Sequence, residues 1–166
     1  MFAVTAKRNT IVFAVTALAT IAIDQGVKAI VAATLEPGQS VRVFAGLRFT
    51  YIRNTGVAFG LFAGAGQILF WGALVLVAAM FVWFYRSRNT RGVLSFVALG
   101  LMVGGALGNL ADRLLRGRVV DFVDFGWWPV FNFADLAIVA GVIILIVVVI
   151  RDLYGGEESR STEVNE

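Results

Sequence analysis

Residues 133–150 read Phe-Ala-Asp-Leu-Ala-Ile-Val-Ala-Gly-Val-Ile-Ile-Leu-Ile-Val-Val-Val-Ile, and their only charged side chain is Asp135. A helix needs roughly 20 residues to cross a hydrocarbon core of about 30 Å. This run therefore predicts a transmembrane helix. Three further apolar stretches, 11–33, 67–85 and 92–110, are long enough for the same role. The sequence thus predicts an all-α membrane fold with four transmembrane helices.

The composition supports this prediction. The 166 residues are 59% hydrophobic and only 15% charged, with a mean hydropathy of +0.84, which is too apolar for an ordinary soluble domain. The formal net charge is +3. The basic residues gather at the ends of the apolar segments, which indicates anchoring to membrane lipids rather than binding to nucleic acid.

The sequence contains no histidine and no cysteine. This excludes thiol nucleophiles, thiolate metal sites, Ser-His-Asp triads and histidine-ligated zinc. The only lysines, Lys7 and Lys28, share no motif with a serine, which disfavours a Ser-Lys hydrolase. Carboxylates remain the natural candidates for chemistry.

The first apolar stretch resembles a secretory signal, because Lys7 and Arg8 precede it. It continues through Asp24 and Lys28 well beyond the length of a signal peptide, so we expect a retained helix. Four spans put both termini on one side. The basic residues before the first helix and in the 86–91 turn favour cytoplasmic termini.

The segment 38–62 is too polar to span a membrane, and its apolar and polar residues alternate from Val41 to Tyr51. This period of two predicts short strands. We expect a small extracytoplasmic β-sheet that lies on the outer leaflet, near the interfacial pair Trp127-Trp128. Residues 1–154 would form one membrane-embedded domain, and residues 155–166 a polar, disordered cytoplasmic tail.

Two aspartates flank the tryptophan-bearing loop, Asp121 between Val120 and Phe122, and Asp135 at the start of the last span. An ionisable group near hydrocarbon is costly and usually has a function. An apolar setting raises the pKa of a carboxyl group. If the two side chains face each other they can share one proton, so that one carboxylate activates water while the other polarises a carbonyl.

Other polar residues have a structural and a functional interpretation. Asp24 and Lys28 share a helix face, and we favour a structural ion pair. Asn54 and Gly56 belong either to a turn or to a loop that recognises a peptide backbone. Asn132 could simply cap the last helix, with Asp135 as its N3 partner.

Asn109, Asp112 and Arg113 share one face where the third span ends. A salt bridge at the helix end would explain Asp112 and Arg113. It would not explain Asn109, which lies on the membrane side of both and presents a polar amide inward.

Together, five strings resemble bacterial lipoprotein signal peptidase, also called signal peptidase II, and their order and spacing match from about residue 24 to 138. They are Asp24-Gln25-Gly26-Val27-Lys28, Asn54-Thr55-Gly56-Val57-Ala58-Phe59, Gly105-Ala106-Leu107-Gly108-Asn109-Leu110-Ala111-Asp112-Arg113, Val119-Val120-Asp121-Phe122 and Asn132-Phe133-Ala134-Asp135.

The resemblance implies an aspartyl endopeptidase of the bacterial cytoplasmic (inner) membrane, with its active site on the extracytoplasmic side. Asp121 and Asp135 match the catalytic pair. The substrate implied is a prolipoprotein whose cysteine carries diacylglycerol, cut on the amino side of that cysteine. We expect a monomer that needs no metal or cofactor. The other matched positions would bind substrate (Asn54, Asn109, Arg113 and Asn132) or support the site (Asp24, Lys28, Gly56 and Asp112).

Two other functions are consistent with carboxylates between helices. A proton or ion pathway needs polar groups across the whole membrane, whereas residues 136–150 are almost pure hydrocarbon. A scaffold without activity would use Asn132 only as a cap and Asp112 with Arg113 only as an anchor. Release of a signal peptide from a lipid-modified precursor would distinguish the protease from both.

Overall fold

Within the part of the chain that the structure describes, three long helices form the body of the fold: α1 (Phe2–Thr34), α3 (Val93–Arg116) and α4 (Phe133–Glu163). The computed structural model describes residues 2–44, 46–54, 71–72, 75, 78–80, 82–83, 85–86 and 92–163. All three helices are long and apolar enough to cross a membrane. About half of the predicted span 67–85 lies outside the described residues, and those of its residues that are described are helical.

The helices are longer than the sequence predicts. α1 begins at Phe2 rather than near residue 11, because no proline or glycine interrupts its first turns. α3 continues past residue 110 and ends at Gly117, whose left-handed backbone (φ +70°) lets its N–H donate to the Arg113 carbonyl. α4 remains helical through Glu163, although the sequence predicts a disordered tail from residue 155. Its last turns contain no proline to end the helix.

Glycines allow α3 to approach α1 closely. A methyl group added at Gly104 would lie 2.7 Å from the Ala17 carbonyl oxygen of α1, and one added at Gly108 would lie 2.6 Å from the Asp24 carboxylate. Small residues at such contacts are typical of packing between membrane helices. The close approach brings the polar residues of α1 against those of α3.

A three-stranded antiparallel sheet has the order β1 (Ser40–Phe44), β2 (Leu47–Asn54) and β3 (Val119–Asp124). The strands β1 and β2 lie inside the predicted segment 38–62, of which residues 45 and 55–62 are not described. The strand β3 was not predicted from the sequence. Its valines, bounded by Gly117 and Gly126, are a strand signal, and its burial on both faces hides the usual alternation.

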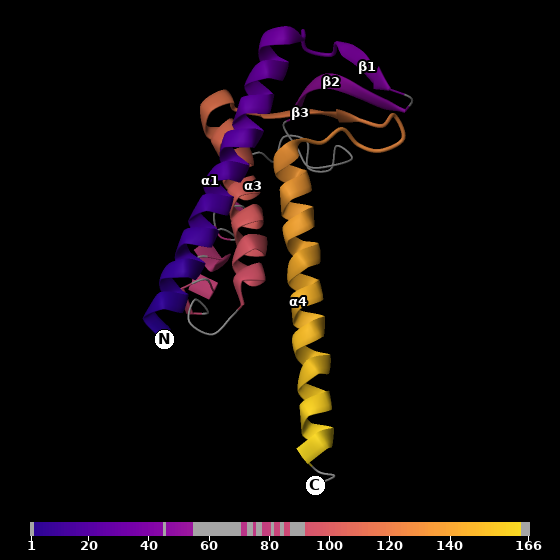
Figure 1. Ribbon diagram of the computed structural model, residues 1–166. Coiled ribbons are helices and arrows are strands. Elements are labelled where there is room, and N and C mark those ends of the chain that lie inside the picture. The colour runs from indigo at the N-terminus through magenta and orange to yellow at the C-terminus, as the bar shows by residue number, and fades with distance from the viewer. Residues whose placement is uncertain are drawn as a thin grey trace.

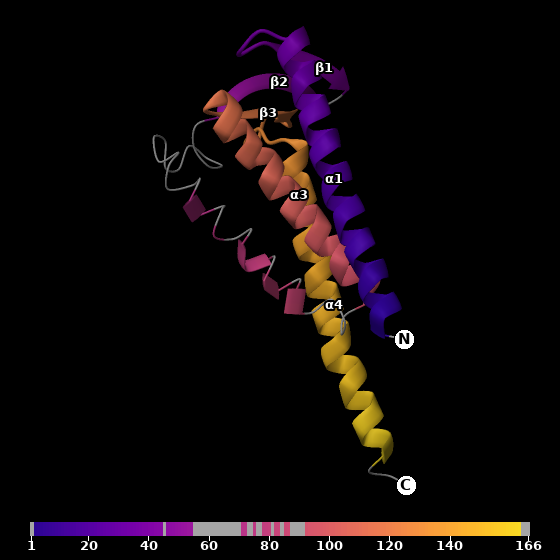
Figure 2. The same cartoon turned by 90° about the vertical axis from the view of Figure 1, so that its left-hand side faces the viewer.

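The sheet lies at one end of the helices, and the start of α1 and the end of α4 lie toward the other end (Figures 1 and 2). In Figure 1 the first turns of α4 begin directly below the sheet. Many large apolar side chains of α4 are exposed, among them Ile143 and Ile146 at 56% and 52%. Exposed apolar helix faces are what contact with lipid requires.

Candidate active site

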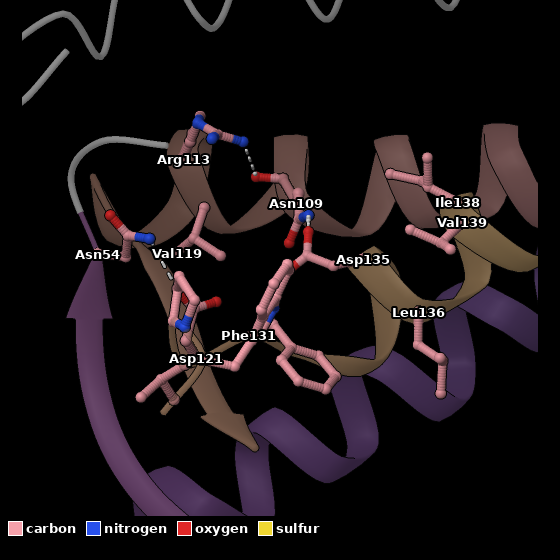
Figure 3. A pocket seen from close by; sticks show the side chains of 13 residues that line it. Asn54, Asn109, Arg113, Val119, Asp121, Phe131, Asp135, Leu136, Ile138 and Val139 are labelled. Carbon is pink, nitrogen blue, oxygen red and sulfur yellow. Dashed lines mark hydrogen bonds between the residues drawn. The ribbon is translucent and has the colours of Figure 1, made fainter. Parts of the chain in front are cut away.

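A cavity of about 490 Å³ opens where β3, the end of α3 and the start of α4 meet. Asp121 comes from the middle of β3, and Asp135 from the first turn of α4. Figure 3 shows both aspartates in this cavity, with Asn54 directed at Asp121 and Asn109 directed at Asp135. The rest of the lining is mainly apolar: Val119, Trp128, Pro129, Val130, Phe131, Leu136, Ile138 and Val139, with Arg113.

Asp121 is 2% exposed and accepts two amide hydrogen bonds. The Asn54 Nδ2 donates to one carboxyl oxygen at 2.8 Å and the Asn132 Nδ2 to the other at 2.6 Å. Burial, together with the negative charge of Asp135, raises the pKa of Asp121 to about 6, against the opposing effects of the two amides and of Lys28. Asp121 is therefore a carboxyl group that gains and loses a proton near physiological pH.

Asp135 is half-buried and also accepts from two donors. The Asn109 Nδ2 donates at 2.8 Å and the Asn132 backbone N–H at 3.2 Å. In return the Asp135 N–H donates to the Asn132 side-chain oxygen at 3.0 Å. This reciprocal pair is a helix cap, so the structural interpretation of Asn132 holds. Because Asn132 also donates to Asp121, one residue both caps α4 and connects the two aspartates.

Lys28 determines which way the Asn109 amide points. Its ammonium group is fully buried and donates to the Asn109 side-chain oxygen at 2.9 Å. A lysine has no acceptor, so the oxygen of Asn109 must face Lys28 and the NH₂ group must face Asp135. The Asn132 Nδ2 donates to the same oxygen at 3.1 Å. Both amides are thereby oriented as donors toward the aspartates.

The same lysine is bound by two buried carboxylates. Its Nζ lies 2.8 Å from Asp24 and 2.9 Å from Asp112, and both carboxylates are fully buried. Asp24 accepts the Ala134 N–H at the start of α4. Asp112 accepts the Val120 N–H next to Asp121. This ionic cluster therefore binds the two chain segments that carry the aspartates, and it contains the ion pair of Asp24 with Lys28.

Arg113 lines the cavity from α3, and its Nη1 donates to the Asn109 carbonyl oxygen at 3.3 Å. Its positive charge interacts favourably with Asp135 and Asp121. A salt bridge at the helix end would require Asp112 to pair with Arg113, and it does not. It binds Lys28 and Arg116 instead.

The structure brings nine of the ten site residues proposed from the sequence into the cavity or the hydrogen-bond network beneath it, and the tenth, Gly56, lies outside the described residues. Sequence reasoning missed Gln25, whose amide contacts Asp24 and the Gly108 carbonyl. It also missed the wall formed by Phe131 and Leu136. Their position directly beside Asn132 and Asp135 was the available signal.

Comparison with known proteins gives a consistent answer. The family described as "Signal peptidase (SPase) II" matches residues 16–151. The lipoprotein signal peptidase of Syntrophomonas wolfei is 43% identical over 145 residues, which cover 87% of this chain and 95% of that protein. That of Moorella thermoacetica is 48% identical over 134 residues, covering 80% and 89%.

A solved structure described as a bacterial membrane enzyme, determined by the in meso method at 2.3 Å resolution, superposes with a TM-score of 0.76 at 35% identity. The alignment covers 85% of this chain and 88% of that one. Sequence and fold agree over most of the chain, and the protein belongs to the signal peptidase II family.

Proposed function

We propose that this protein cleaves the signal peptide from prolipoproteins whose cysteine carries diacylglycerol, on the amino side of that cysteine, with Asp121 and Asp135 as the catalytic pair. The observation that carries the proposal is the shared cavity: both carboxyl groups line it, and each is held by amide donors. A pKa of about 6 at Asp121 supports a pair that holds one proton near neutral pH.

The reaction needs only these two carboxyl groups and water. The ionised aspartate takes a proton from a water molecule, whose oxygen attacks the scissile carbonyl carbon, while the protonated aspartate gives its proton to the carbonyl oxygen. In the second step the newly protonated aspartate donates to the amide nitrogen, and the C–N bond breaks. The tetrahedral intermediate returns its extra proton to the other aspartate, so the pair ends as it began.

The surrounding residues support substrate binding and orientation. Asn109 and Asn132 keep donors on the carboxyl groups, and we assign Arg113 and Asn54 to the polar backbone of the peptide. Asp24, Lys28 and Asp112 hold the framework. The apolar wall from Leu136 to Val139 continues into the exposed face of α4, which offers the acyl chains of the substrate a path that stays in lipid.

We further propose a monomer in the bacterial cytoplasmic (inner) membrane, with four transmembrane helices, the 67–85 segment being one of them, and one domain over residues 1–154. The sheet would lie on the extracytoplasmic leaflet and both termini in the cytoplasm. The start of α1 and the end of α4 lie away from the sheet, which supports a common side for the termini (Figure 1). Gly56 would belong to the substrate loop that follows Asn54.

Cleavage of a lipid-modified precursor by the purified protein tests the catalytic assignment. Asp121→Asn and Asp135→Asn should each abolish release of the signal peptide, because neither variant can complete the proton cycle. Asp124→Asn is the matched control: it lies on the same strand, and its carboxylate accepts from Thr50 and Arg48 outside the cavity. Cleavage by both dyad variants at the rate of the control would refute the assignment.

The topology can be tested separately, because the sequence contains no native cysteine. Arg42→Cys on β1 and Lys7→Cys near the start of α1 each place a cysteine at an exposed position. In intact cells, a membrane-impermeant thiol reagent should label Arg42→Cys and leave Lys7→Cys unlabelled until the membrane is opened. The reverse pattern would place the sheet in the cytoplasm.

A further inference from the structure

A second, smaller cavity of about 210 Å³ lies on the opposite face of the sheet from the aspartates. It is lined by Tyr51, Arg53, Arg116, Arg118 and Val120. Arg53 pairs with Val120 across the strands, whereas the neighbouring pair is Ile52 with Asp121. Because successive strand residues point to opposite faces, the basic cavity and the catalytic cavity are separated by the sheet itself.

Two of its arginines carry uncompensated charge. Within the part of the chain that the structure describes, neither Arg53 nor Arg118 lies within 4.0 Å of a carboxylate. The Arg53 Nε donates to the Tyr51 hydroxyl at 3.1 Å, and its guanidinium carbon lies 5.5 Å from the centre of the Tyr51 ring. Tyr51 is almost fully buried. The tyrosine therefore holds the guanidinium in place, and its hydroxyl proton can be donated to a ligand.

The third arginine is anchored in the protein core. The Arg116 Nη1 donates to the buried Asp112 carboxylate and, at 3.0 Å, to the Gln25 side-chain oxygen. This attachment uses one corner of the guanidinium group, and the Arg116 side chain is 35% exposed. Since a guanidinium presents five N–H donors in a rigid plane, the rest of the group can bind an anion in the cavity.

The depth of the cavity identifies the kind of anion. The helix α3 is long and apolar enough to cross a membrane and ends at Arg116, and we infer that the three arginines lie where the hydrocarbon ends and the lipid headgroups begin. The cavity is smaller than the roughly 300 Å³ at which drug-sized ligand sites begin, and it fits a headgroup rather than a peptide. Arginine forks match the oxygens of a phosphate in geometry and charge.

We propose that the cavity formed by Tyr51, Arg53, Arg116, Arg118 and Val120 binds the phosphate of an anionic phospholipid headgroup and so attaches the back of the sheet to the membrane surface. The ligand chemistry is a phosphate anion, and the depth selects lipid over free phosphate as its source. The proposal does not depend on the catalytic assignment, because it uses the other face of the sheet.

Native mass spectrometry of the purified protein in a nonionic detergent can measure the affinity for each added lipid. Arg53→Gln combined with Arg118→Gln should weaken phosphatidylglycerol binding by about 30-fold, the effect of two arginines at roughly 1 kcal/mol each, and leave phosphatidylcholine binding unchanged. Arg8→Gln with Arg42→Gln removes the same charge from exposed positions outside the cavity, and should bind phosphatidylglycerol like the wild type.

Arg53→Lys with Arg118→Lys keeps the charge but loses the planar fork, and should give an intermediate affinity. This variant decides the question if the glutamine variant does not fold. The proposal fails if the two glutamine pairs lose affinity equally, if phosphatidylcholine binds as well as phosphatidylglycerol, or if the lysine variant binds like the wild type. Displacement of the lipid by millimolar inorganic phosphate would assign the cavity to free phosphate and refute the proposal that its ligand is a lipid.

Discussion

Replacing Asp121 by asparagine should stabilise the folded protein at neutral pH while it abolishes cleavage. Asp121 is buried, and its pKa is raised from 3.8 to about 6. The folded protein therefore binds more protons at this site than the unfolded chain between about pH 4 and 6. Its free energy of unfolding falls as the pH rises through this window. Asparagine cannot ionise and avoids this loss.

The pKa difference sets the size of the effect. At 1.36 kcal/mol per pKa unit, a rise from 3.8 to about 6 corresponds to about 3 kcal/mol at pH 8. An asparagine can accept from only one of the two amides that now donate to Asp121, because its own NH₂ group faces the other. One lost hydrogen bond costs about 1 kcal/mol. We expect a net gain of about 2 kcal/mol.

Unfolding of the purified protein by a denaturing detergent, followed by tryptophan fluorescence at pH 4 to 8, measures this difference. The advantage of Asp121→Asn should be largest at pH 8 and disappear near pH 4. Asp124→Asn should behave in the opposite way, because the Thr50 hydroxyl and then Arg48 hold the pKa of Asp124 below its usual range. Its loss of stability should be present at neutral pH and shrink at strongly acidic pH. Parallel curves for the wild type and Asp121→Asn from pH 4 to 8 would refute the reasoning.

Two further predictions concern the ionic cluster. Lys28→Met should lower the free energy of unfolding by about 3–5 kcal/mol, because it leaves two buried carboxylates without their cation; Lys7→Met, at an exposed position, should change it little, and equal effects would contradict the cluster's role. Gly108→Ala should reduce both stability and cleavage, because the new methyl group would lie 2.6 Å from the Asp24 carboxylate. Gly26→Ala, with open space around it, should do neither, and a Gly108→Ala enzyme with full activity would show that the contact can relax.

The helices could be predicted from the sequence because an apolar run of sufficient length has few alternatives in a membrane. Their ends could not, because hydropathy does not report where backbone hydrogen bonding stops. α3 passes through the charged residues after Leu110 and ends only where Gly117 adopts a left-handed backbone. The strand β3 was missed for a related reason: it is buried on both faces, so its sequence lacks the alternation that identified β1 and β2.

The grouping of the site was accessible from the sequence, since Asp121 and Asp135 follow one another closely and Asn132 begins the helix that carries Asp135. The connections were not. Nothing in the spacing of Lys28 indicates that it contacts Asn109, 81 positions away. Such contacts depend on how closely α1 and α3 pack, and this is a property of the folded structure.

Lys28 can only donate hydrogen bonds, and its contact with Asn109 affects how protons can move around the two aspartates. Each aspartate is surrounded by amide N–H groups, which hold a negative charge in place but do not relay a proton as water or imidazole can. A proton that the pair takes from the attacking water therefore cannot pass through these hydrogen bonds into the helix bundle. The arrangement insulates the reaction from the charged cluster only one side chain away, and it is already complete before any substrate arrives.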